Sequence, residues 1–138
     1  MVNYWVFVSV EYGSYSIDSV KDVIKRIRKT GKWYIGPHTA NRNNIQKGDK
    51  IIIYQVGEDG KKFIGSATIN SELKSDREDP YDYIVLSDVR IWKMPLEIPS
   101  VINNMSFFAN RKRWGSRFQA GISKLPERDY LYLVRVTQ

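Results

Sequence analysis

The feature of this sequence that most constrains its fold is a pair of strand-like segments joined by a tight-turn signature. The segment 50–56 is rich in isoleucine, and the segment 62–70 follows it after Glu58-Asp59-Gly60. An Asp-Gly pair between two such segments is typical of a β-hairpin, because both residues tolerate the positive φ angles of a two-residue turn. We therefore predict that 50–56 and 62–70 pair as antiparallel strands.

Further strands and one amphipathic helix are predicted around this hairpin. The aromatic and β-branched segment 4–10 is typical of a buried strand, and 33–35 of a short one. Apolar residues at helical spacing predict a helix over 17–30, with Ser16 as its N-cap and Gly31 as its end. Alternation predicts a strand over 83–92. One face of that strand should carry Tyr83, Val85, Ser87, Val89 and Ile91.

The end of the chain allows two interpretations. Pro95 and Pro99 are expected to bar regular structure after the strand 83–92. Pro126 can open a helix at Glu127, but the segment 130–136 also alternates like a strand.

The order of these elements predicts one domain over 1–138 in the α+β class. Its architecture should be a closed or nearly closed β-barrel of about five or six mostly antiparallel strands with peripheral helices. The helix 17–30 is expected to lie on the outside. The residues expected in the core are Trp5, Val6, Val8, Ile51, Ile53 and Ile64.

Composition excludes several functional classes. The chain has no cysteine and only one histidine, His38, so disulfides, thiolate metal sites and histidine-rich zinc sites are excluded. No phosphate-binding glycine loop occurs, and we expect no cofactor. The apolar runs 4–8 and 51–54 are far shorter than the roughly 20 residues of a membrane span. No N-terminal signal pattern is present, so we expect a soluble, cytoplasmic protein.

The charge balance indicates a polyanionic partner. Lys and Arg number 22 against 15 acidic residues, a formal net charge of +7. Nucleic acid is the first interpretation and an acidic membrane surface the second, while many small basic proteins are merely soluble. We expect nucleic acid and no membrane. The predicted phosphate-binding residues are Lys25, Arg28, Lys29, Lys32, Arg42, Arg111, Lys112, Arg113 and Arg117.

Aromatic and amide side chains suggest a base-binding pocket. Planar rings stack on nucleobases, and amides offer the paired donor and acceptor that suit a base edge. Trp5 and Trp92 lie inside strand patterns and are expected in the core, whereas Trp33 and Trp114 could serve either the core or a ligand. Trp33 follows a Gly-Lys turn, where no core aromatic is required. The predicted pocket residues are Ser9, Trp33, Tyr34, Asn43, Asn44, Tyr54, Gln55 and Trp114.

The order of several short motifs resembles the EVE domain family over essentially the whole chain. They are Tyr4-Trp5, Ser9, Trp33-x-x-Gly36, Arg42-Asn43-Asn44-Ile45, Lys47-Gly48-Asp49, Tyr54-Gln55 and Ile64-Gly65-Ser66-Ala67. The segments 103–114 and 125–130 are similar to archaeal members. Two places differ from the family pattern: Val10-Glu11 replaces Glu-Pro, and Gln55 replaces a histidine. These differences bear on base specificity and not on the fold.

The resemblance implies a PUA-like barrel, related to YTH domains, with a pocket for a modified nucleobase. The stretch 31–34 also resembles the YTH segment whose tryptophan forms one wall of an aromatic cage. It implies a reader without catalysis that accepts a flipped base of the methylated adenine or cytosine type. Similar domains occur as readers on restriction-type ATPases, so the chain is either free-standing or an excised module.

Two other functions remain open at this level. One is a PUA-like module that binds tRNA or rRNA without preference for a modification. The other is a hydrolase or nuclease that uses a lysine and a carboxylate such as Asp49 as acid and base. An aromatic pair around one pocket distinguishes the reader from the first alternative, and turnover of modified nucleosides identifies the second.

Overall fold

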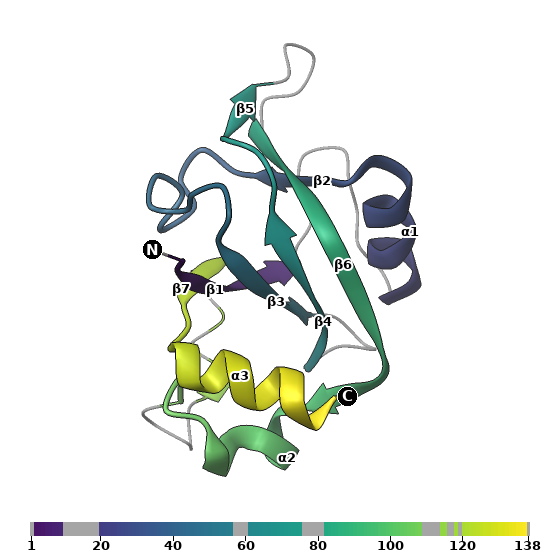
Figure 1. Cartoon of the computed structure of the whole chain (residues 1–138), viewed down its shortest axis with the longest axis vertical. Coiled ribbons are helices and arrows are strands. Elements are labelled where there is room, and N and C mark those ends of the chain that lie inside the picture. Colours follow the sequence, from purple (N-terminus) through teal and green to yellow (C-terminus); the bar gives the residue numbers. More distant parts are fainter. Residues whose placement is uncertain are drawn as a thin grey trace.

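The computed structural model describes residues 2–9, 20–56, 61–75, 82–108, 114–115, 118 and 120–137 (Figure 1). This part of the chain holds seven strands, three α-helices and one 3-10 helix. In order they are β1 Tyr4–Ser9, α1 Val20–Thr30, β2 Lys32–Ile35, β3 Lys50–Gln55, β4 Lys62–Ile69, β5 Lys74–Ser75, β6 Asp82–Glu97, α2 Ile98–Val101, the 3-10 helix η1 Ile102–Asn104, β7 Ile122–Lys124 and α3 Glu127–Val136.

The strands form one curled, mixed sheet with the order β2-β6-β4-β3-β1-β7, and β5 also pairs with β6. The pair β1–β3 is parallel, and the other pairs are antiparallel. The predicted α+β class, with a mostly antiparallel sheet and peripheral helices, is confirmed. The barrel is a half-barrel, however, because β2 and β7, which end the strand order, do not pair within the described residues.

Both strands of the hairpin expected from the sequence are present and pair with each other. β3 and β4 run antiparallel, with Ile51 opposite Ala67 and Ile53 opposite Gly65. The turn residues 58–60 lie outside the described residues. The sequence pattern therefore located the central pair of the sheet correctly.

Two apolar clusters lie on opposite faces of this sheet, because successive side chains of a strand point to opposite sides. On β1, Trp5 and Phe7 enter the first cluster, which α1 covers through Ile27. Val6 and Val8 enter the second, which α2, η1 and α3 cover. The six residues predicted to be buried are all at most 3% exposed. Figure 1 shows α1 beside β6, and α2 and α3 at the end of the molecule away from β2.

The helix α1 ends as predicted at Gly31, which has a φ of +68° and donates its N–H to the carbonyl of Ile27 at 2.7 Å. Glycine adopts this left-handed conformation without the steric cost that a Cβ imposes. The predicted N-cap Ser16 lies outside the described residues. Ile27 is buried, whereas Lys25, Arg28 and Lys29 are exposed, so the helix is amphipathic and lies outside the sheet as expected.

The prediction that Pro95 and Pro99 interrupt regular structure is wrong. β6 runs on to Glu97, and Pro95 falls between Ile91 and Leu96, where β6 has no residue partners on β4. A proline there removes no ladder hydrogen bond. Pro99 lies in the first turn of α2, where the absent N–H is not needed.

The residues predicted to share one face of β6 are divided between the two sides of the sheet. Ile84 and Leu86 are the buried residues in its first half, whereas Tyr83 and Val85 are only half-buried. At Asp88 the backbone has a φ of +48°, and the pairing with β4 shifts there. This bulge exchanges the two faces, so that Val89 packs against the first cluster.

The C-terminal segment is a helix and not a strand. Pro126 precedes α3, which has Glu127 and Asp129 in its first turn. Asp129 and Leu133 are buried four residues apart, the spacing of one helix face. The Asp129 carboxylate accepts hydrogen bonds from the backbone N–H groups of Ser106 and Phe107 at 3.1 and 2.6 Å. Asp129 thereby anchors the segment 106–107, which follows η1, to α3.

Candidate nucleic-acid interface

Two predicted pocket residues meet at the carboxyl ends of the parallel strands β1 and β3. Ser9 lies opposite Gln55, and its hydroxyl donates to the Gln55 amide oxygen at 2.7 Å. The Gln55 amide nitrogen donates to the carbonyl of Val56 at 2.9 Å. Both residues are fully buried. The structure brings these two predicted pocket residues together, but their polar groups bond within the protein.

Trp33 is a core residue in this structure, contrary to the expectation that no core aromatic is required at its position. Its side chain is 0% exposed and belongs to the first apolar cluster. The ring centroid lies 5.7 Å from that of Phe7. The guanidinium carbon of Arg26 lies 5.9 Å from the Trp33 ring, within cation–π range. The reason for the error is that β2 pairs with β6 and so belongs to the sheet.

The predicted pocket wall is divided between the two faces of the sheet. Tyr54 and Trp114 belong to the second cluster, whereas Trp33 belongs to the first. The Tyr54 ring stacks on Phe118 with 3.6 Å between centroids, and burial raises the pKa of Tyr54 to about 12. Trp114 is half-buried beside the same Phe118. Trp33 and Trp114 therefore do not form one aromatic cage.

The asparagines of the loop between β2 and β3 are more accessible. Asn43 and Asn44 are exposed, and the Asn44 amide nitrogen donates to the Asn41 side-chain oxygen at 3.2 Å. Asn41 adopts a φ of +63°, and its amide nitrogen donates to the carbonyl of Ile122 in β7 at 2.9 Å. The loop is thus bound to β7 through Asn41, and the side chains of Asn43 and Asn44 are exposed to solvent.

Arg42, in the same loop, serves the structure and is not available as a predicted phosphate contact. One guanidinium nitrogen donates to the carbonyls of Ile35 and Gly36 at 3.3 and 3.2 Å. The other forms an ion pair with Asp82, the first residue of β6. These bonds tie the loop to the sheet end and neutralise the charge, which corrects the sequence prediction.

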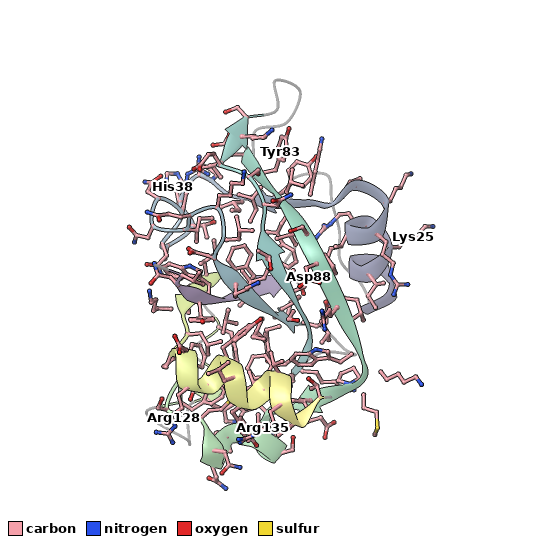
Figure 2. All side chains as sticks on the ribbon, viewed as in Figure 1. Lys25, His38, Tyr83, Asp88, Arg128 and Arg135 are labelled. Carbon is pink, nitrogen blue, oxygen red and sulfur yellow. The ribbon has the colours of Figure 1, made fainter. Side chains whose placement is uncertain are left out.

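The exposed face of α1 carries three of the predicted phosphate-binding residues around a hollow. The hollow has a volume of about 680 Å³ and is lined by Ile24, Lys25, Arg28 and Lys29. Figure 2 shows Lys25 on α1, at the outer edge of the molecule. None of the three cations forms an ion pair with a carboxylate in the described part of the chain. They are i, i+3 and i+4 neighbours, so they repel one another until an anion binds.

A second cationic position lies at the start of β2, just after α1. The ammonium of Lys32 is 4.5 Å from the ring centroid of Tyr83. Tyr34 lies 5.9 Å from the same ring, and it is itself 4% exposed. Tyr83 was expected only as a strand residue, and its contact with Lys32 depends on the pairing of β2 with β6, which no local pattern reveals. The predicted contacts Arg111, Lys112, Arg113 and Arg117 lie outside the described residues.

Asp49, the carboxylate of the enzymatic alternative, has a structural role. One oxygen accepts from the Trp5 indole and from the N–H of Gln46, both at 2.9 Å, and the other accepts from the N–H of Asn3 at 3.1 Å. The residue is 2% exposed. A carboxylate that is buried and bonded in this way is not placed to exchange protons with a substrate, so the suggested acid–base role is wrong.

The described residues contain no group of three or more His, Asp or Glu side chains placed to hold a metal ion. None of the helices in these residues combines the length and apolar character that crossing a membrane requires.

Comparison with solved structures identifies the fold. Protein Atu2648 from Agrobacterium tumefaciens has a TM-score of 0.67 and 19% identity, covering 99% of this chain and 93% of that one. Human THYN1, solved in complex with 5-methylcytosine containing DNA, has a TM-score of 0.67 and 14% identity, covering 99% and 98%. The Pho92 YTH domain, solved in complex with m6A, has a TM-score of 0.60 and 15% identity, covering 99% and 86%.

The sequence itself gives a narrower result. No curated protein sequence matches the chain significantly. The EVE domain, in contrast, matches residues 3–136, nearly the whole length. This chain belongs to the EVE domain family.

Proposed function

We propose that this protein is a nucleic-acid-binding reader that accepts one extruded, modified nucleobase of the methylated adenine or cytosine type and performs no catalysis. The observation that carries the proposal is the hollow on α1, where Lys25, Arg28 and Lys29 surround the apolar Ile24. Membership of the EVE family and a fold shared with two proteins solved with 5-methylcytosine DNA and with m6A support it.

The chemistry of the hollow suits a phosphate backbone. Unpaired lysine and arginine side chains bind phosphates and release counterions, which supplies most of the affinity for a nucleic acid. The hollow is shallow and widely open, which suits a strand lying across the helix. Positioning by phosphate contacts then leaves base recognition to other groups.

The exposed amides of Asn43 and Asn44 are the proposed base-edge contacts. The Asn43 side chain makes no hydrogen bond within the described residues, and the Asn44 side-chain oxygen likewise has no donor there. An amide matches the donor and acceptor pattern of a base edge. Extrusion costs a few kcal/mol and is easiest for single-stranded or modified sites, which favours single-stranded ligands or damaged duplexes.

The test is a fluorescence-anisotropy titration with oligonucleotides that differ in a single base. Single-stranded and duplex DNA and RNA would carry N6-methyladenine, 5-methylcytosine, 5-hydroxymethylcytosine or the unmodified base. The proposal expects one modified ligand to bind more tightly than its unmodified counterpart. Equal affinities for all ligands would instead favour the RNA-binding module without modification preference, and conversion of the modified nucleoside would establish an enzyme.

A charge-matched pair of variants tests the hollow itself. Replacing Lys25, Arg28 and Lys29 by Gln should weaken oligonucleotide binding by about tenfold or more at low salt. The control replaces three exposed lysines elsewhere, Lys47, Lys61 and Lys93, by Gln, with the same change in net charge. Equal losses in the two variants would show that only the overall charge matters and would remove the hollow from the proposal.

A further inference from the structure

A second groove lies far from α1, between η1 and the outer face of α3. It has a volume of about 750 Å³. α1 and α3 occupy separate parts of the molecule in Figure 1. The residues that line the groove are Asn104, Glu127, Arg128, Leu131, Tyr132 and Arg135.

The centre of this groove is apolar. Leu131 is 54% exposed. Tyr132 lies next to it, half-buried against the second cluster. Its hydroxyl accepts a hydrogen bond from the Asn104 amide nitrogen at 3.1 Å, which holds the ring in place. Leu131 and Tyr132 thus provide a fixed, accessible apolar surface.

Two arginines border this apolar centre along the same helix. Arg128 and Arg135 are exposed, and Figure 2 shows them on α3. Neither forms an ion pair in the described part of the chain. The Arg135 guanidinium carbon lies 6.0 Å from the Tyr132 ring. One acidic residue, Glu127, also lines the groove, and the pKa of Tyr4 is raised first by burial and then by this carboxylate.

We propose that this groove docks an extended segment of a partner protein in which one apolar residue lies between two acidic residues, in the order acidic–x–apolar–x–acidic. Seven helical residues separate Arg128 from Arg135, a rise of about 10 Å. In an extended peptide, positions −2 and +2 lie about 13 Å apart and share a face with position 0. The carboxylates can therefore reach both guanidinium groups while the apolar side chain covers Leu131.

The composition of the groove favours a protein partner over a nucleic acid. Protein interfaces have an apolar centre with tyrosine and arginine enriched and a polar rim. A phosphate backbone offers nothing that would cover Leu131, and the three-cation cluster of α1 is the better phosphate site. The docking proposal does not depend on the reader function, because the two surfaces share no residue.

The direct test is an NMR titration of the ¹⁵N-labelled chain with a capped peptide containing Glu-Ser-Leu-Ser-Glu. The peptide should shift the amide signals of α3 and η1 and leave those of α1 in place. Peptides with Ser in place of the central Leu, or Gln in place of both Glu residues, should bind at least about fivefold more weakly. Absence of shifts at millimolar peptide, or equal binding of all three peptides, would overturn the proposal.

Variants separate the two possible classes of partner. Arg128→Glu combined with Arg135→Glu, and separately Leu131→Ser, should each weaken peptide binding at least about fivefold. The charge-matched control for the arginines is Lys47→Glu with Lys93→Glu, and the control for Leu131 is Met94→Ser. All three positions are exposed, and neither control should change peptide binding. Thermal melts would verify that each variant is folded. If the double arginine variant weakens oligonucleotide binding as much as the α1 variant does, the groove belongs to the nucleic-acid surface and the docking proposal fails.

Discussion

At the scale of single residues, Trp33 of β2 packs between β1 and α1 in the first apolar cluster. Its ring touches Phe7 of β1 and lies under Arg26 of α1, with no exposed surface. Removing a side chain of this size from a packed interior leaves a cavity, so Trp33→Ala should lower the stability by about 3–5 kcal/mol. A thermal or urea melt measures this loss.

Two comparisons decide the role of Trp33. Trp33→Phe keeps much of the ring and should lose clearly less stability than Trp33→Ala. Trp114→Ala, at a half-buried position, should also lose less. An unchanged melting temperature for Trp33→Ala, together with weaker binding of a modified oligonucleotide, would return Trp33 to the base pocket.

Tyr54 predicts a stability change at alkaline pH. Burial raises its pKa from 10.0 to about 12 in the folded state, so the folded protein holds this proton more tightly than the unfolded chain. The resulting stability is complete below pH 10 and is lost as the pH rises toward 12. Tyr4 and Tyr130 also have raised pKa values. The difference between wild type and Tyr54→Phe therefore isolates Tyr54, and parallel curves above pH 10 would contradict this account.

The candidate site could be predicted only in part, because a sequence gives residue types but not which face of a sheet they occupy. The basic face of α1 follows from helical periodicity, and the structure has it. Trp33, Tyr54 and Trp114 were grouped by chemistry, but the pleat assigns them to two clusters. The binding partners of Arg42 are distant in sequence or lie in backbone groups, so its structural role had no local signal.

At the scale of elements, the strands and helices with a strong periodicity of apolar residues were predicted correctly. The strands β1, β3 and β4 and the helix α1 follow from alternation or helical spacing together with a turn or a glycine. β6 was predicted too short and with one continuous face, whereas the bulge at Asp88 changes the alternation within the strand. The helix α3 became decidable only through its packing on the second cluster.

The crossing of β4 and β6 depends on a glycine. A Cβ on Gly65 would lie 2.4 Å from the carbonyl oxygen of Arg90 and 3.2 Å from the Cα of Ile91. Backbone atoms cannot move aside as a flexible side chain does, so Gly65→Ala should destabilise the protein by about 1–3 kcal/mol. The control is Gly115→Ala, where a Cβ would have no neighbour within 4 Å among the described residues. Equal melting temperatures for the two variants would show that the strands do not approach so closely.

At the scale of the whole molecule, the exposed positive charge lies on separate surfaces on the two sides of one sheet. The exposed cations of α1 lie over the first cluster, and the two arginines of α3 lie over the second. Neither the cations of α1 nor the arginines of α3 are needed to stabilise the core, because exposed charges contribute little to folding. Substitutions at these two surfaces should therefore change binding without changing the fold, which makes the two proposed functions separable by mutation.

The salt dependence of oligonucleotide binding tests this division of charge. If roughly four to six phosphates are contacted, the slope of log K against log salt concentration should be about −3 to −5. Replacing Lys25, Arg28 and Lys29 by Gln should reduce its magnitude by about 2 to 3, because each lost contact removes about 0.7–0.9. Replacing Arg128 and Arg135 should leave the slope unchanged, because those arginines are assigned to a protein partner. A flat salt response of the wild type would contradict the nucleic-acid interpretation. If the wild type has the expected slope but the substitutions in α3, and not those in α1, reduce it, nucleic acid remains the partner and α3 is its binding surface.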